Sequence, residues 1–302
     1  MSVAKKRNIL IIIIVVLFGG SYARHKIIAK ETDITGRLQN KQMNETSGIA
    51  ASGIFKDIYY VHNDSGDTSR FFSISPDGKL KSTIYYNGDH SEKQGVVDCE
   101  DIAVGPGPVK GKSYVYVGYI GDNQAIRPSV TIYRIEEKTA WAKDSLITTT
   151  AVPLHLKYPD GPKDAEALMI DPVEKLIYVV SKRTDTVSIY TTPLLYKPND
   201  TQVLTKRGKL FFKGVKPLKW ITAGDISRDG QQVLLKNYEK VYYWKREANE
   251  HIWQTMLKKP QEPHYEAEKQ GEAIGFTLDG KGYFTVSEGV FATIYYYKAP
   301  GQ

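Results

Sequence analysis

Residues 97–135, VDCEDIAVGPGPVKGKSYVYVGYIGDNQAIRPSVTIYRI, contain one full copy of the pattern that decides the fold. The copy opens with a small or acidic stretch that ends in an aliphatic residue, here Ile102. Two runs rich in β-branched and aromatic residues follow, at 113–123 and 130–135. Runs of this composition, bounded by glycine, proline and aspartate, are typical of β-strands.

The same pattern occurs five times along the chain. The opening segments are NETSGIAA, VDCEDIAV, KDAEALMI, ITAGDISR and KQGEAIGF. Asp-Gly turns at 75–79, 227–231 and 277–281 separate β-rich runs and predict antiparallel hairpins. Repeated small antiparallel sheets predict an all-β fold, a β-propeller.

The spacing of the repeats predicts the number of blades. The residues two positions before each aliphatic residue are Ser47, Glu100, Glu166, Gly224 and Glu272. The five positions define four gaps, each long enough for four strands. The two chain ends together supply a fifth segment of comparable length. We therefore predict five blades, closed by a strand from residues 26–38 that pairs beside 293–298. Six blades remain the alternative, if the long gap between Glu100 and Glu166 contains an irregular blade.

In a propeller, equivalent positions of the inner strands meet around one axis. Three of the five positions are carboxylates, Glu100, Glu166 and Glu272, and Ser47 adds a hydroxyl. Converging carboxylates repel one another, and a hard divalent cation relieves that repulsion. Ca²⁺ accepts six to eight oxygens in flexible geometry, so we predict a Ca²⁺ site held by these four residues. At the fourth position, Gly224 offers no side chain, and Thr222, a carbonyl or water would have to substitute.

Further acidic residues flank this ring in the sequence. Glu45, Asp98 and Asp164 lie two positions earlier and share a strand face with it, so we expect them at the channel mouth. Asp101 and Asp225 lie one position later. By the same period they should point away from the channel and make structural hydrogen bonds.

Polar residues also end the second strand of each repeat, where loops at one mouth of a scaffold collect binding groups. They are His62, Asn63, Asp64, Asp122, Asn123, Lys182, Arg183, Lys236, Asn237, Ser287 and Glu288. A shared pocket is one interpretation, with Lys182 and Arg183 set against a phosphate or carboxylate. The alternative is that each segment is only a good turn former. His62 is accordingly either a general base or a turn residue.

Other compact motifs are absent from the sequence. There is no Gly-x-Ser-x-Gly nucleophile elbow and no Walker phosphate loop. The single cysteine, Cys99, excludes an intramolecular disulfide and a cysteine-based zinc site.

The run SGIAAS, HNDSG, DCEDIAVGP, GDN and YPDGPKDAEAL resembles exported bacterial β-propellers of the phytase-like, esterase-like and SdiA-regulated group. A more distant resemblance is to five-bladed calcium-activated nucleotidases (apyrases), which implies an axial Ca²⁺ held by Ser and Glu side chains. Ser47, Glu100, Glu166 and Glu272 match those residue types, and QGEAIGF is similar to that family's Glu-Gly-Ile segment. Gly224 departs from the pattern.

Three functions follow as hypotheses. The first is a metal-dependent phosphoester hydrolase, acting on a nucleotide- or phytate-like small molecule, in which Asp98 or Asp164 accepts a proton from water and Lys182 and Arg183 offset negative charge. The second is a non-enzymatic propeller that binds a protein or a glycan and whose metal is structural. The third is a lactonase-like or esterase-like hydrolase.

The N-terminus predicts export. Lys5, Lys6 and Arg7 precede ten apolar residues (9–18), and Ser21 and Ala23 form a signal-peptidase site, so residues 1–23 are interpreted as a signal peptide and 24–302 as one domain. An uncleaved anchor is the alternative. Removing the three basic residues reduces the formal net charge from +7 to +4 without a concentrated basic face, so we expect no nucleic-acid binding. A secreted or periplasmic monomer is expected.

Overall fold

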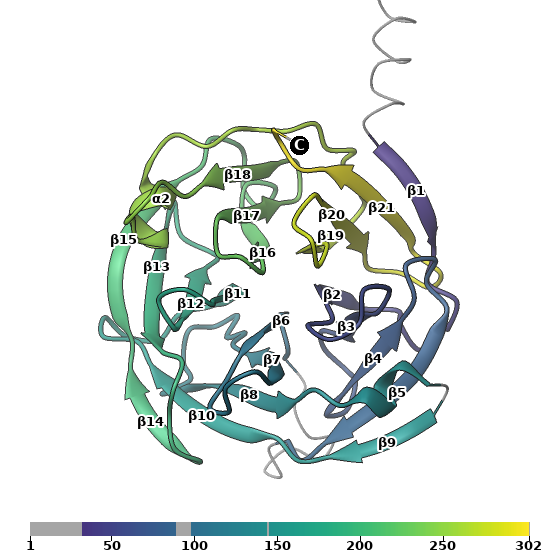
Figure 1. The fold of residues 1–302 in the computed structure, drawn as a ribbon. Coiled ribbons are helices and arrows are strands. Elements are labelled where there is room, and N and C mark those ends of the chain that lie inside the picture. Colours follow the sequence, from purple (N-terminus) through teal and green to yellow (C-terminus); the bar gives the residue numbers. More distant parts are fainter. Residues whose placement is uncertain (1–31, 89–97, 144, 302) are drawn as a thin grey trace, which may run out of the picture.

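Five small sheets form a ring around a central axis (Figure 1). The computed structural model describes residues 32–88, 98–143 and 145–301. The innermost strand of each sheet comes from one predicted repeat: β2 (Thr46–Ala51), β6 (Asp101–Pro106), β11 (Ala165–Asp171), β16 (Ile221–Ile226) and β19 (Gly271–Phe276). These strands contact one another in that cyclic order, and β19 closes on β2. The prediction of a five-bladed β-propeller is confirmed.

The remaining strands run outward from the axis within each blade. They are β3 (Tyr59–Asn63), β4 (Arg70–Ile74) and β5 (Leu80–Tyr86) in blade one, β7 (Ser113–Tyr119), β8 (Val130–Glu136) and β10 (Val152–Lys157) in blade two, β12 (Leu176–Ser181), β13 (Thr186–Pro193) and β15 (Thr205–Phe211) in blade three, β17 (Gln232–Asn237) and β18 (Val241–Lys245) in blade four, and β20 (Gly282–Ser287), β21 (Thr293–Lys298) and β1 (Thr32–Arg37) in blade five. The short helix α2 (Ile252–Leu257) packs against β15 and β18.

The two ends of the chain close the ring, as the repeat spacing predicted. β1 pairs antiparallel with β21 in blade five, with Asp33 opposite Tyr296 (Figure 1). Residues 26–31 of the predicted strand lie outside the described residues. The pairing protects the outer edge of β21 and holds the last blade to the chain segment that starts the first.

Two outer strands belong to a different blade from their sequence neighbours. β9 (Ser145–Thr149) lies between strands of blade two in the sequence but pairs in parallel with β5 of blade one. β14 (Asp200–Val203) pairs in parallel with β10 of blade two, although blade three surrounds it in the sequence. The long gap between Glu100 and Glu166 therefore contains an exchanged strand. It does not contain a sixth blade.

Apolar side chains fill the spaces between blades. The described residues form five buried clusters, and each cluster draws on two neighbouring sheets. Between blades one and two, Tyr60 and Phe71 pack edge-to-face with Trp141, which is 1% exposed. Because every blade is packed on both sides, the inner strands are held in a fixed relation, and residues on their ends are brought to defined positions.

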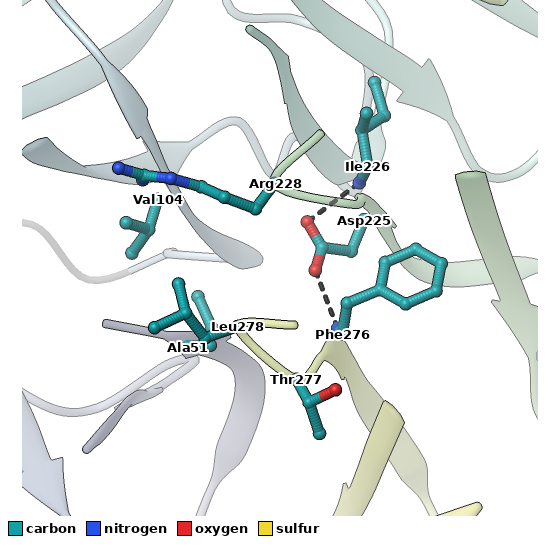
Figure 2. Close-up of a pocket in the computed structure, with 9 residues that line it drawn as sticks. Ala51, Val104, Asp225, Ile226, Arg228, Phe276, Thr277 and Leu278 are labelled. Carbon is teal, nitrogen blue, oxygen red and sulfur yellow. Dashed lines mark hydrogen bonds between the residues drawn. The ribbon is translucent and has the colours of Figure 1, made fainter. Parts of the chain in front are cut away.

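Asp101 and Asp225 hold inner strands together at the axis. The Asp101 carboxylate accepts hydrogen bonds from the amides of Ile102 and Leu168, both at 2.8 Å, and from Gly224 at 3.4 Å. Asp225 likewise accepts from Ile226 and Phe276 at 2.8 Å (Figure 2). The prediction of structural hydrogen bonds agrees with this geometry, but the prediction that Asp101 points away from the channel is wrong. The amides on the inner edge of these strands have no sheet partner, and a carboxylate that turns inward satisfies them.

Candidate metal centre at the axial mouth

One end of the axis is lined by carboxylates from four blades. These residues lie where inner strands begin (Asp98, Glu100, Asp164, Glu166, Glu272) and where second strands end (Asp64, Glu288). An isolated β-bridge between Ser65 and Asp98 brings the loop after β3 beside the segment before β6. Antiparallel pairing within each blade brings strand starts and strand ends together, so the fold collects these residues at one mouth.

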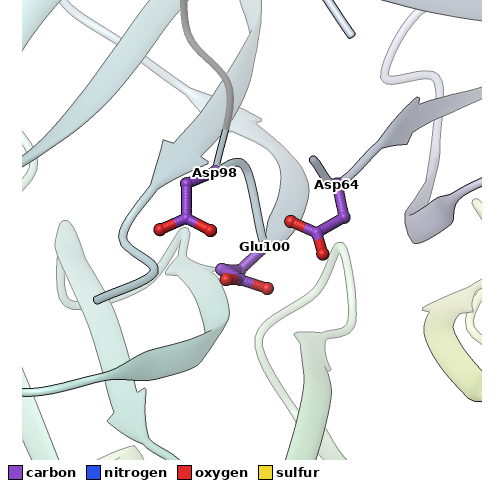
Figure 3. A group of neighbouring side chains, drawn as sticks. All are labelled: Asp64, Asp98 and Glu100. Carbon is purple, nitrogen blue, oxygen red and sulfur yellow. The ribbon is translucent and has the colours of Figure 1, made fainter. Parts of the chain in front are cut away.

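Seven carboxylates form three overlapping groups. Within each group the ligand oxygens lie within 4.8 Å of one another: Asp64, Asp98 and Glu100 (Figure 3); Asp64, Glu272 and Glu288; and Glu100, Asp164 and Glu166. Glu100 and Asp64 each belong to two groups. A Cβ atom at Gly121 would lie 2.1 Å from the Glu100 Oε1 atom, so a glycine there leaves room for the cluster.

Burial and mutual repulsion disfavour the ionised form of these groups. Burial, together with Glu166 and Asp98, raises the pKa of Asp64 to about 8. Burial also raises the pKa of Glu166 to about 7, against the opposing effect of Lys182. The pKa of Glu288 rises to about 8 through burial and the nearby Glu272. For Glu100, burial and Glu166 raise the pKa well above its usual range.

Three cations and a phenol border the cluster. The Lys182 ammonium pairs with Glu166 at 2.5 Å, and the Arg183 Nε donates to Asp164. The Tyr238 hydroxyl donates to Glu272 at 2.5 Å. Arg127 also acts on Asp98, so three cations face seven carboxyl groups, and the mouth is rich in acidic groups.

Two carboxylate oxygens at the centre have no hydrogen-bond partner among the described residues. They are Oε2 of Glu166, a side chain only 2% exposed, and Oδ1 of Asp64. Desolvated carboxylate oxygens without a donor are costly. All the candidate ligand atoms are carboxylate oxygens, the type of ligand that Ca²⁺ and Mg²⁺ prefer. The residues present therefore fit a divalent cation.

The structure changes the predicted ring in two positions. In four blades the pairing of the inner strand with the second strand skips one residue at the same place. The skipped residues are Ser47, Glu166, Thr222 and Glu272, so Thr222 is the blade-four counterpart of the other three. The choice of Gly224 was two residues out of register. The Ser47 hydroxyl donates to the Glu100 carbonyl oxygen at 2.8 Å. In this geometry Ser47 links blades one and two.

Several predicted pocket residues instead hold local turns. Asn63 bonds to the backbone of Gln42 and Glu45, and the Asp122 carboxylate accepts from the amides of Ile126 and Arg127. Asn123 is exposed. For Asn63 and Asp122 the turn-forming alternative fits the contacts, because short polar side chains readily bond to nearby backbone.

Three other predicted residues lie apart from the three carboxylate groups. His62 is fully buried with Nδ1 against its neighbour's carbonyl oxygen, and burial lowers its pKa to about 4, so it is not placed to act as a base on a substrate. Lys236 is also fully buried, and its ammonium donates to the Gly271 carbonyl oxygen. Glu45 lies at the margin, where its charge acts on Glu288.

The sequence reasoning missed Tyr238 and Trp220. Tyr238 directly follows Lys236 and Asn237, at the position equivalent to Asp64, Lys182 and Glu288 in the other blades. That repeat position was a usable signal. Trp220 immediately precedes β16 and had none.

The raised pKa values predict how the metal-free protein responds to pH. In the folded state Asp64, Glu166 and Glu288 titrate near 7 to 8, whereas unfolded carboxylates titrate near about 4. The folded state therefore holds more protons across this window, and the free energy of unfolding falls as pH rises through it. Thermal melts in EDTA from pH 5.5 to 8.5 should show a falling melting temperature. A flat profile would contradict the clustered geometry.

Comparisons with known proteins add only a remote likeness. No family model and no curated protein matches the chain. Among solved structures, a luciferin-regenerating enzyme is similar over 89% of this chain and 95% of its own, at 9% identity and a TM-score of 0.48. The described part of the chain includes no helix with the length and hydropathy of a transmembrane span. The predicted signal peptide at 1–23 lies outside the described residues.

Proposed function

We propose that this propeller binds a divalent cation, Ca²⁺, at the axial mouth. The observation that carries the proposal is the overlap of three carboxylate groups around the unpartnered Glu166 oxygen. Glu100, shared by two groups, is the central ligand, with Glu166 and Asp64 on either side. Ca²⁺ suits this irregular set better than Mg²⁺, which requires near-octahedral order.

We further propose that the bound cation serves hydrolysis of a small phosphoester. When bound, a divalent cation polarises a phosphoryl oxygen and orients a water molecule. Asp98 is the better placed of the two proposed bases, because Asp164 is occupied by Arg183 and by the Asp122 amide. Burial raises the pKa of Asp98, which moves this half-buried carboxyl toward the range of a general base.

The cations at the edge of the cluster favour an anionic substrate. The Arg183 side chain is 34% exposed, so its guanidinium remains open to a ligand while its Nε holds Asp164. Arginine binds phosphate oxygens with two parallel hydrogen bonds. Export of the chain, as its N-terminus suggests, would place the site where Ca²⁺ is abundant.

Cation binding is tested by melting the protein with and without a chelator. A cation present at 100 times its dissociation constant stabilises the folded state by about 2.7 kcal/mol. For a domain of this size we expect Ca²⁺ to raise the melting temperature by about 5–10 °C. Equal melting temperatures after exhaustive EDTA treatment and after Ca²⁺ addition would contradict the site.

Hydrolysis is tested separately with purified protein. Nucleoside diphosphates, aryl phosphates and lactones are incubated with the protein in Ca²⁺ and in EDTA. We expect Ca²⁺-dependent turnover of a phosphoester. Cation binding without any turnover would instead support a structural metal in a protein that binds a protein or glycan, and turnover of lactones alone would indicate an esterase.

A further inference from the structure

A cavity of about 610 Å³ opens beside the carboxylate cluster, between blades three, four and five. Its walls come from the loop after β12, the segment before β16, the loop after β17 and the segment before β19. Cavities of 300–1,000 Å³ are the usual size for small-molecule sites. Of its lining residues, the sequence singled out only Lys182 and Arg183.

The cavity and the cluster share part of a wall. Lys182, Arg183 and Tyr238 line the cavity, and each also contacts a cluster carboxylate. A ligand in the cavity would therefore lie one side chain away from the proposed cation. The three residues bring the cavity and the reacting centre together.

The walls combine apolar surface with charged side chains, three basic (Lys182, Arg183, Lys269) and two acidic (Glu239, Glu268). Pro217, Leu218 and Trp220, from the segment before β16, supply apolar surface to the lining, and Leu218 is 44% exposed. The Arg183 guanidinium lies 5.0 Å from the centre of the Trp220 ring, and the Lys182 ammonium lies 5.9 Å from that of Tyr238. Aromatic faces beside cations suit a planar ring that carries an anionic group.

We propose that this cavity binds a planar aromatic group of the substrate, which makes the substrate an aryl-type phosphoester. The inference rests on the proposed function for the position of the reacting phosphoryl group. The ring packs against Trp220 and Leu218, and the phosphoryl group faces Arg183 and the cluster. The cavity wall, and not the cation, then sets the preference among phosphoesters.

The test compares 1-naphthyl phosphate with methyl phosphate. Binding of each is measured by calorimetry in EDTA and in Ca²⁺. We expect the naphthyl compound to bind at least about tenfold more tightly, since burying a ring of this size adds more than 1.4 kcal/mol. Trp220→Ala should remove most of that difference and leave methyl phosphate binding unchanged. Val215→Ala, at a 73% exposed position outside the cavity wall, is the matched control.

A second variant guards against a folding defect in Trp220→Ala. Leu218→Asn removes the apolar contact at a half-exposed position without adding charge, and it should weaken naphthyl phosphate binding by a similar factor while leaving methyl phosphate binding unchanged. Equal affinity of the wild type for both phosphates, or equal losses for both in the variants, would overturn the cavity proposal. Ca²⁺ binding is measured on the same samples, so a failure of the metal site appears separately.

Discussion

Glu100→Gln is expected to weaken Ca²⁺ binding by about 100-fold or more and, at the same time, to stabilise the metal-free protein. Glu100 is 3% exposed and belongs to two of the three carboxylate groups, so the change removes a shared ligand. It also removes a buried carboxyl group whose ionised form is disfavoured by burial, Glu166 and Asp64, so folding no longer has to protonate or desolvate that group. Opposite signs in the two measurements distinguish loss of a ligand from general damage to the fold.

The measurement is Ca²⁺ calorimetry together with thermal melting in EDTA. Glu100 is chosen for substitution instead of Glu166 because Glu166 pairs with Lys182. Replacing Glu166 would leave the buried Lys182 ammonium without its partner. Glu262→Gln removes the same charge at the exposed outer rim and should alter neither quantity. Unchanged Ca²⁺ affinity in Glu100→Gln would rule out the proposed centre.

Asp101→Ala should cause the largest loss of stability, about 3 kcal/mol or more. The carboxylate is fully buried and accepts hydrogen bonds from amides of blades two, three and four. Alanine leaves at least two of these amides without an acceptor, at about 1–3 kcal/mol each. For this chain length the melting temperature should fall by roughly 6 °C or more.

Asp101→Asn and Asp225→Ala test whether the loss of stability depends on the number of amides that lose their acceptor. Asparagine keeps one acceptor oxygen and should lose less stability than alanine. Asp225 accepts hydrogen bonds from two amides, whereas Asp101 accepts from three, and Asp225 is only partly buried. Asp225→Ala should therefore also lose less stability than Asp101→Ala. Asp57→Ala, at an exposed turn, is the control. A loss at Asp101 no larger than at Asp57 would mean that the inward carboxylate does not hold the blades.

The ring was predictable because its signals are local and repeated. Asp-Gly turns and β-rich runs recur in each blade, and the leftover length at the two ends indicated their pairing. The pairing of β9 and β14 with the blade before their own was not predictable. A short outer strand such as Ser145–Thr149 has the same composition whichever neighbour it pairs with.

The site was predictable in part, and the errors have a local cause. Glu100, Glu166 and Glu272 lie at one mouth because equivalent strand positions converge there. The blade-four position was misassigned because Asp225 looks like Asp101 in the sequence, yet the register places it two residues further along. Asn63 and Asp122 could not be separated from binding residues, since a turn and a pocket favour the same short polar side chains.

The exchanged outer strands also constrain how the protein is made. Blade one is incomplete until residue 149 has been synthesised, blade two until residue 203, and blade five needs both termini. The ring itself closes only after β21 has been synthesised, because β21 pairs with β1 in blade five.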